Sequence, residues 1–149
     1  MDELATVLGD ERHLLDLLLY RLITCRELLA AGGARFLAYA ATEVEETTER
    51  VQEAELRRSL LVARLARRLD SDELTLMDLC LHSREPFGTI FSEHRKAFVE
   101  LMSEIEEVVS ENRRLTPGPV EDVLVEAGHQ ALLAAISGLS FPSLTDFLA

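Results

Sequence analysis

The sequence contains few aromatic residues. It has no tryptophan, two tyrosines and six phenylalanines among 149 residues, whereas β-strands are enriched in aromatic and β-branched residues. Leucine, alanine, glutamate and arginine are abundant instead, and these residues favour helices. The composition therefore disfavours a sheet and predicts an all-α protein.

Basic residues are scarce relative to acidic ones. Fifteen lysines and arginines stand against 27 aspartates and glutamates, which gives a formal net charge of -12. Binding to phosphate groups needs clustered lysine and arginine, because neutralised phosphates release counterions. The charge argues against a nucleic-acid partner and against an anionic membrane surface.

Long apolar runs and paired cysteines are also missing, and a signal peptide is not expected. No run of ~18 uncharged apolar residues predicts a transmembrane helix. The first residues lack the basic start and continuous apolar run of a signal peptide. Cys25 and Cys80 are isolated in the sequence, and outside an oxidising compartment they are expected to be reduced thiols. We expect a cytoplasmic protein without membrane insertion.

Prolines and glycines are few, four and seven respectively, and residues 34–69 contain neither. The clearest apolar stripe lies between residues 87 and 115, and residues 2–31 and 34–69 show the same spacing. Steps of four and three residues keep side chains on one helical face, which packs against other helices as in a coiled coil. The residues of the clearest stripe are Phe87, Phe91, His94, Phe98, Leu101, Ile105, Val108, Asn112 and Leu115.

Local signals divide the chain between these helices. Gly32-Gly33 predicts a chain reversal, and Thr75 with Asp78 resembles a capping box that begins a short helix ending near His82. Residues 120–137 predict a fourth helix, followed by a short apolar tail. We predict a single all-α domain over 1–149, an elongated antiparallel helical bundle of three long helices plus a short connecting helix and a C-terminal helix. Its parts are a bundle core (1–115), a Pro/Gly break (116–119) and a C-terminal helix and tail (120–149).

Catalytic and cofactor motifs are not found. The sequence has no Gly-rich phosphate loop, no nucleophile elbow and no nucleotide signature, so we predict no enzyme and no cofactor. Glu126-x-x-His129 matches the spacing used by di-iron four-helix bundles. The best second copy, Asp10-x-x-His13, has an aspartate in place of the glutamate. A di-metal bundle remains an alternative interpretation, although one pair is not a site. Another pair, Asp78 and His82, could bind a metal but is more often a surface pair.

Two polar residues lie on the clearest stripe. His94 could act as a pH switch or ligand, but the preferred interpretation is a buried-edge histidine that is hydrogen-bonded to a neighbour. Asn112 could fix the register of the helices.

Five arginines gather within residues 56–69, which contain no acid. They predict either a basic docking site or, preferred here, a solvated face that complements the helix dipole. One of them, Arg58, also falls on the apolar stripe of its helix. The cluster consists of Arg57, Arg58, Arg64, Arg67 and Arg68.

Three stretches together resemble the FlgN family of flagellar export chaperones, in particular its divergent actinobacterial forms. They are ERHLLDLLLYRLITCRELLAAGGARFLAYAATEVEETTERVQEAELRRSLLV at 11–62, HRKAFVELMSEIEEV at 94–108, and the helix end SENRRL. The resemblance covers roughly residues 4–115. The C-terminal part departs from the family pattern, because the break at 116–119 interrupts the helix and a Phe-containing tail replaces the usual Tyr and Gly.

The resemblance implies a small, acidic, non-enzymatic chaperone that holds hook-filament junction proteins of the FlgK and FlgL type before type III secretion. The flagellar export apparatus is a further candidate partner, and the protein could be a monomer or a homodimer. Helix-in-groove recognition suits such amphipathic cargo, and ordering the cargo segment costs ~2–5 kcal/mol. An alternative is a helical adaptor or oligomerisation module of another system.

In this family the C-terminal region binds cargo. After residue 115 this chain is apolar, loosely patterned and free of lysine and arginine, which is typical of a lid that folds back or of a partner-binding segment. The expected partner-binding residues are Val123, Leu124, Ala127, Ala131, Leu132, Ile136, Phe141, Leu144, Phe147 and Leu148.

Overall fold

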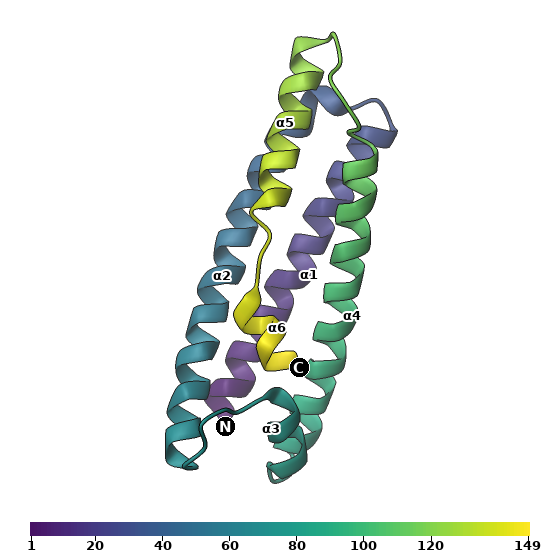
Figure 1. The fold of residues 1–149 in the computed structure, drawn as a ribbon. Coiled ribbons are helices and arrows are strands. Elements are labelled where there is room, and N and C mark those ends of the chain that lie inside the picture. Colours follow the sequence, from purple (N-terminus) through teal and green to yellow (C-terminus); the bar gives the residue numbers. More distant parts are fainter. The chain divides into compact units, whose positions relative to one another are not determined.

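The computed structural model describes all residues from 1 to 149 and contains helices but no strand (Figure 1). This confirms the predicted all-α class. The elements, in chain order, are α1 (Asp2–Ala30), the 3-10 helix η1 (Ala34–Phe36), α2 (Leu37–Arg68), α3 (Leu76–His82), α4 (Phe87–Arg114), α5 (Val123–Ser137) and α6 (Pro142–Leu148).

The chain forms two compact units that share its three long helices. Each unit contains a part of α1, of α2 and of α4, and each adds one C-terminal helix of its own: α6 in unit 1 and α5 in unit 2. Unit 1 consists of Met1–Leu14, Arg50–Leu101 and Phe141–Ala149. Unit 2 consists of Leu15–Glu49 and Met102–Ser140.

The turn after α1 depends on its two glycines. Gly32 has φ 77°, a left-handed conformation that glycine adopts without steric cost. The N–H of Gly33 donates to the carbonyl of Leu28 at 2.8 Å, which satisfies one of the last carbonyls of the helix. A Cβ at Gly33 would lie 2.9 Å from Leu28 Cδ2. The predicted reversal is confirmed.

The predicted capping box at α3 is present. The N–H of Asp78 donates to Thr75 Oγ1 at 3.2 Å, and the N–H of Thr75 donates to Asp78 Oδ2 at 2.9 Å. The start of α5, in contrast, differs from the prediction. The carboxylate of Asp122 accepts from the N–H groups of Leu124 and Val125, so the helix begins at Val123 and not at Val120.

The core of unit 1 is apolar except for one charged pair, Glu11 and Arg58, which are 0% and 1% exposed. The apolar core residues come from all five helices of the unit. They are Leu4, Val7, Leu8, Leu14, Val51, Ala54, Ala66, Leu76, Leu79, Phe91, Phe98, Leu101, Phe141, Leu144 and Phe147.

The core of unit 2 contains smaller side chains, and its main polar member is Asn112. The amide of Asn112 is fully buried and donates to the carbonyl of Leu22 at 3.1 Å, so it ties α4 to α1 as a register-fixing residue would. The apolar core residues are Leu15, Leu18, Leu19, Leu22, Cys25, Leu37, Ala40, Ala41, Val44, Ile105, Val108, Leu132, Ala135 and Ile136.

Membrane-spanning potential is low in every helix taken singly. None is both long enough and apolar enough to cross a bilayer, and α5 and α6 meet the criteria of length and composition only when joined across their break.

Candidate functional site

The expected partner-binding residues fall into an exposed group and a buried group. Val123 is 78% exposed and Leu124 is 66% exposed; Ala127 is also exposed and Ala131 is half-buried. The other group faces the protein interior: Leu132 and Ile136 in unit 2, and Phe141, Leu144 and Phe147 in unit 1, with Leu148 half-buried.

The apolar tail folds back as helix α6. Within unit 1 this helix lies between α2 and α4 (Figure 1) and contacts α3. Leu144 is 0% exposed, and the two phenylalanines that flank it, Phe141 and Phe147, are also buried. Of the two predicted roles of this segment, a lid that folds back describes its position in the structure.

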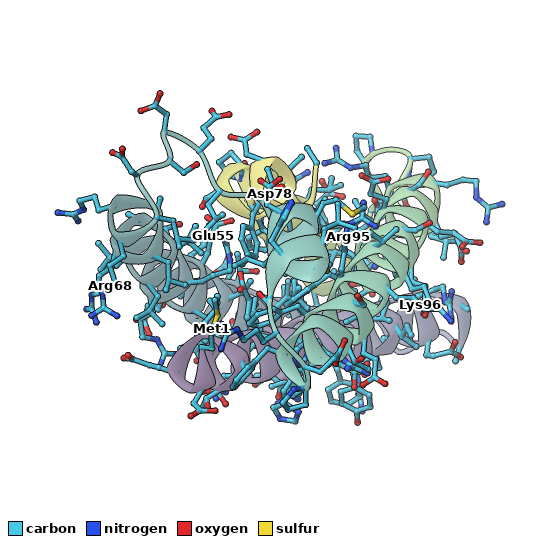
Figure 2. The ribbon with its side chains drawn as sticks, turned by 90° about the horizontal axis from the view of Figure 1, so that it is seen from below. Met1, Glu55, Arg68, Asp78, Arg95 and Lys96 are labelled. Atoms are coloured by element: carbon cyan, nitrogen blue, oxygen red, sulfur yellow. The ribbon has the colours of Figure 1, made fainter.

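Both ends of α6 meet a side chain of complementary charge. The N–H of Leu144 donates to the carboxylate of Glu55 in α2 at 2.9 Å, while the N-cap residue Phe141 offers no side-chain acceptor. At the other end, Arg95 of α4 donates to the carbonyl of Leu148 at 3.4 Å. Glu55 and Arg95 point toward α6, whereas Arg68 points outward (Figure 2). These contacts satisfy backbone groups that lack partners at the helix ends, and they place a negative charge at its N-terminus and a positive charge at its C-terminus, as the helix dipole favours.

Hydroxyl and guanidinium groups of α2 also contact Ser143, in the first turn of α6, and Phe147, near its C-terminal end. The hydroxyl of Ser143 lies 2.5 Å from that of Ser59 and accepts a hydrogen bond from Arg58 at 3.3 Å. The Arg58 guanidinium also lies over the Phe147 ring, 4.5 Å from its centroid, a cation–π contact. We refer to Glu55, Arg58, Ser59 and Arg95 as the α6 site.

Beneath α6, Arg58 pairs with Glu11 of α1. The Nε of Arg58 donates to both carboxylate oxygens, at 2.9 and 3.2 Å. Burial raises the pKa of Glu11 to about 7, and the nearby positive charge of Arg58 only partly opposes this effect. Arg58 therefore positions three partners at once: Glu11, Ser143 and Phe147.

The interpretation of Arg58 as part of a solvated face is wrong. Arg57, Arg64, Arg67 and Arg68 are exposed as predicted, but Arg58 is a core residue because its helical position faces α1. One signal could have identified the pair: Glu11 and Arg58 both interrupt apolar stripes, with opposite charges.

A groove with a volume of about 250 Å³ borders α6. Its walls come from α2, from the segment before α3 and from α6 itself. They include Val62, Ala63, Leu74, Asp146 and Phe147. The space beside α6 is therefore not filled by the chain.

The exposed group lies at the start of α5, in unit 2. We define the α5 surface as Val123, Leu124 and Ala127 together with Val120, which precedes the helix and is 41% exposed. Every side-chain hydrogen bond of α5 stays within residues 120–137. The helix is instead fixed by close packing.

Gly128 allows that packing. A Cβ at this position would lie 2.8 Å from the carbonyl oxygen of Ala34 and 3.0 Å from Leu37 Cβ. The small residue lets α5 approach the backbone of η1, so α5 docks with this side and leaves its first turn open.

The residues considered for metal binding do not converge. The carboxylate of Glu126 accepts hydrogen bonds from Gln130 and from the N–H of Val120, which lower its pKa, and His129 is buried with Nδ1 unbonded. Asp78 caps α3, while His82 Nδ1 bonds to the Asp78 carbonyl. No group of three or more His, Cys, Asp or Glu is placed to hold a metal.

His94 is half-buried on α4. Burial, followed by the charge of Arg12, lowers its pKa. Its buried Nδ1 has no hydrogen-bond partner, so the hydrogen bond that the sequence predicted is not formed at this nitrogen.

Comparisons with known proteins found no relative. No protein-family model matches the chain, and neither the curated proteins nor the solved structures gave a match.

Proposed function

We propose that this protein is a non-enzymatic chaperone that binds an amphipathic terminal helix of another protein. The proposed cargo is a hook-filament junction protein of the FlgK or FlgL type, held in the cytoplasm before type III secretion. The pattern of residues 4–115, which resembles the FlgN family, suggests this cargo class.

The observation that carries the proposal is the α5 surface. A leucine and a valine that are 66% and 78% exposed on adjacent positions of one helix leave apolar area in water that a partner would remove. At ~25 cal/mol per Å² of apolar surface, covering it favours binding. The helix is also packed closely against η1 at Gly128, and a surface held in place before the partner arrives lowers the entropic cost of binding.

The neighbouring charges suit a basic cargo segment. Asp122 and Glu126 flank the α5 surface, and residues 116–149 contain no lysine or arginine. A cargo helix with leucines on one face and a lysine or arginine beside them would match both features.

The test is direct binding by titration calorimetry. Full-length protein is titrated with synthetic C-terminal helical segments of FlgK-type and FlgL-type proteins from the same cells. Leu124→Glu is expected to weaken binding at least tenfold. Leu60→Glu is the matched control. Leu60 is 60% exposed on α2, is distant in sequence from the α5 surface, and belongs to unit 1 and not to unit 2.

The controls separate three results. Circular dichroism should show both variants as helical as the parent protein. If neither cargo segment binds the parent protein, the proposed function is wrong. If the two variants bind equally, the α5 surface is not the site. A homodimer that dissociates in Leu124→Glu alone, measured by light scattering, would instead support an oligomerisation module.

A further inference from the structure

We propose that unit 1 contains a second polypeptide-binding site, which α6 occupies as an internal ligand and which accepts a partner helix with the same residue pattern. The inference relies on the proposed function only for the identity of the natural partner. Its occupant is defined by the chemistry of the α6 site.

Polar side chains of α2 and α4 bind α6 at several positions, as a receptor binds a peptide ligand. A helix of seven residues is too short to be stable in water by itself, so its structure depends on the groups around it. Glu55, Ser59 and Arg58 bind its first turn, and Arg58 and Arg95 contact its C-terminal end at Phe147 and at the Leu148 carbonyl.

Removing α6 would leave these groups without partners. Arg58 is 1% exposed and faces Ser143 and Phe147; without α6, one side of its guanidinium would lose both contacts. Apolar core residues beneath Leu144 would also meet water. The site therefore needs an occupant, and exchange is favourable only for a segment that restores the same contacts.

The contacts specify that segment. It must form a helical turn with a free N–H for Glu55, a small hydroxyl at the position of Ser143, a leucine-like side chain next to it, and an aromatic ring four residues after the hydroxyl. A short amphipathic helix with the pattern aromatic-x-Ser/Thr-Leu-x-x-aromatic meets these requirements.

The site has room for a larger occupant than α6. Outside α6, the groove of about 250 Å³ beside it is lined by Val62, Ala66 and Leu74, so a longer helix or larger side chains can occupy space that α6 leaves open. A partner can thus gain contacts that the internal ligand does not make.

Tethering makes α6 a competitor. A segment joined by a short linker has an effective concentration in the millimolar range, and a partner must displace it. The partner's apparent dissociation constant is its intrinsic value divided by the fraction of molecules in which α6 has left the site. α6 therefore acts as an autoinhibitory contact.

The experiment locks α6 in place and asks whether the site still binds. The hydroxyls of Ser59 and Ser143 are 2.5 Å apart, so Ser59→Cys with Ser143→Cys places two sulfurs within reach of a disulfide. Cys80→Ser removes the partly exposed native thiol. Cys25 is retained, because burial raises the pKa of its thiol to about 11 and keeps it unreactive.

The probe is a fluorescein-labelled peptide of residues 140–149, SFPSLTDFLA, added to this full-length chain carrying Leu144→Ala to loosen α6. Fluorescence anisotropy should show binding to the reduced form and a loss of at least tenfold in affinity on oxidation. A peptide with the Phe147→Ala change should bind at least tenfold more weakly than the parent peptide. Equal peptide binding by the reduced and oxidised forms overturns the proposal.

A second comparison covers the case in which Leu144→Ala fails to fold. The same cysteine pair with Leu144 intact is compared reduced and oxidised, at higher peptide concentration, and the reduced form should again bind more tightly. Cargo segments are tested on the same two forms. If the cargo segments bind and neither they nor the peptide distinguish the two forms, the proposed function stands and this inference fails. If the peptide alone binds, and binds the reduced form more tightly, the α6 site stands and the proposed cargo is wrong.

Discussion

The two C-terminal helices complete their units in opposite ways. In unit 1, α6 buries Leu144 and Phe147 together with its N-cap residue Phe141, and it is held by four polar side chains of α2 and α4. In unit 2, α5 has no side-chain hydrogen bond to another helix, docks through a glycine and leaves Val123 and Leu124 in water.

The ion pairs of the two units also differ in how deeply they are buried. Ion pairs in unit 2, such as Arg26–Glu111 at 3.0 Å, have side chains about a third exposed, and pairs of this kind contribute little. The Glu11–Arg58 pair of unit 1 is buried. Directional contacts therefore specify the position of α6, whereas the shape of its docking face specifies the position of α5.

The largest expected effect concerns the buried pair. Arg58→Met should destabilise the protein by ~3–5 kcal/mol, because it leaves Glu11 buried without its counter-charge. The double variant Glu11→Leu with Arg58→Met should recover much of this loss. Urea denaturation measures both. A double variant as unstable as the single one would show that Arg58 acts mainly through α6.

Next is the packing of the two helices. Leu144→Ala in α6 should cost ~2–5 kcal/mol, because the side chain is fully buried and its removal leaves a cavity. Leu124→Ala in α5 should change stability by less than ~0.5 kcal/mol, because that side chain is exposed. Thermal denaturation of the two variants compares them; similar losses would contradict the difference between the helices.

The pH dependence of stability should reveal Glu11. Its folded-state pKa is raised to about 7 from 4.5, so the folded protein holds a proton between these values that the unfolded chain has released. The contribution of Glu11 protonation to the free energy of unfolding is fully present below about pH 4.5 and is lost as the pH rises through about 7. The loss is on the order of 3 kcal/mol at most. Denaturation of the parent and of Glu11→Gln across pH 5 to 8 should show a falling stability that the variant lacks, and parallel curves would contradict it.

The smallest effect tests the docking face of α5. Gly128→Ala should cost ~1–3 kcal/mol, because the added Cβ would meet backbone oxygen at 2.8 Å and the helices must shift. Gly118→Ala is the control, since a Cβ there meets nothing within 4 Å. Urea denaturation of both variants gives the comparison, and a stable Gly128→Ala would mean that α5 is free to move away from η1.

The long helices were predictable because their spacing and breakers agree. The stripe at 87–115 became α4, and Gly32-Gly33 and the Thr75 capping box ended or began helices where expected. These features depend on residues close together in the chain. Local chemistry also explains the error at α5, because Asp122 is a better N-cap than the residues before it.

The α6 site was not predictable in the same way. The tail has too few residues for a periodic signal, and its helix is specified by Glu55 and Ser59, which are far away in sequence. The charges of Glu11 and Arg58 marked two stripe positions as unusual, but only the fold shows that they face each other. The exposed and buried members of the predicted partner-binding residues could not be separated without knowing which side of α5 carries the close approach.

The contacts of α6 also determine the order of events during synthesis. Ser59 meets a residue 84 positions later, and Glu55 meets one 89 positions later, so these bonds cannot form until residues 143 and 144 have left the ribosome. Until then, a nascent protein whose first three long helices have emerged presents the α6 site empty. Any helix that fits it has its least contested access at that stage, before the tethered competitor has been translated.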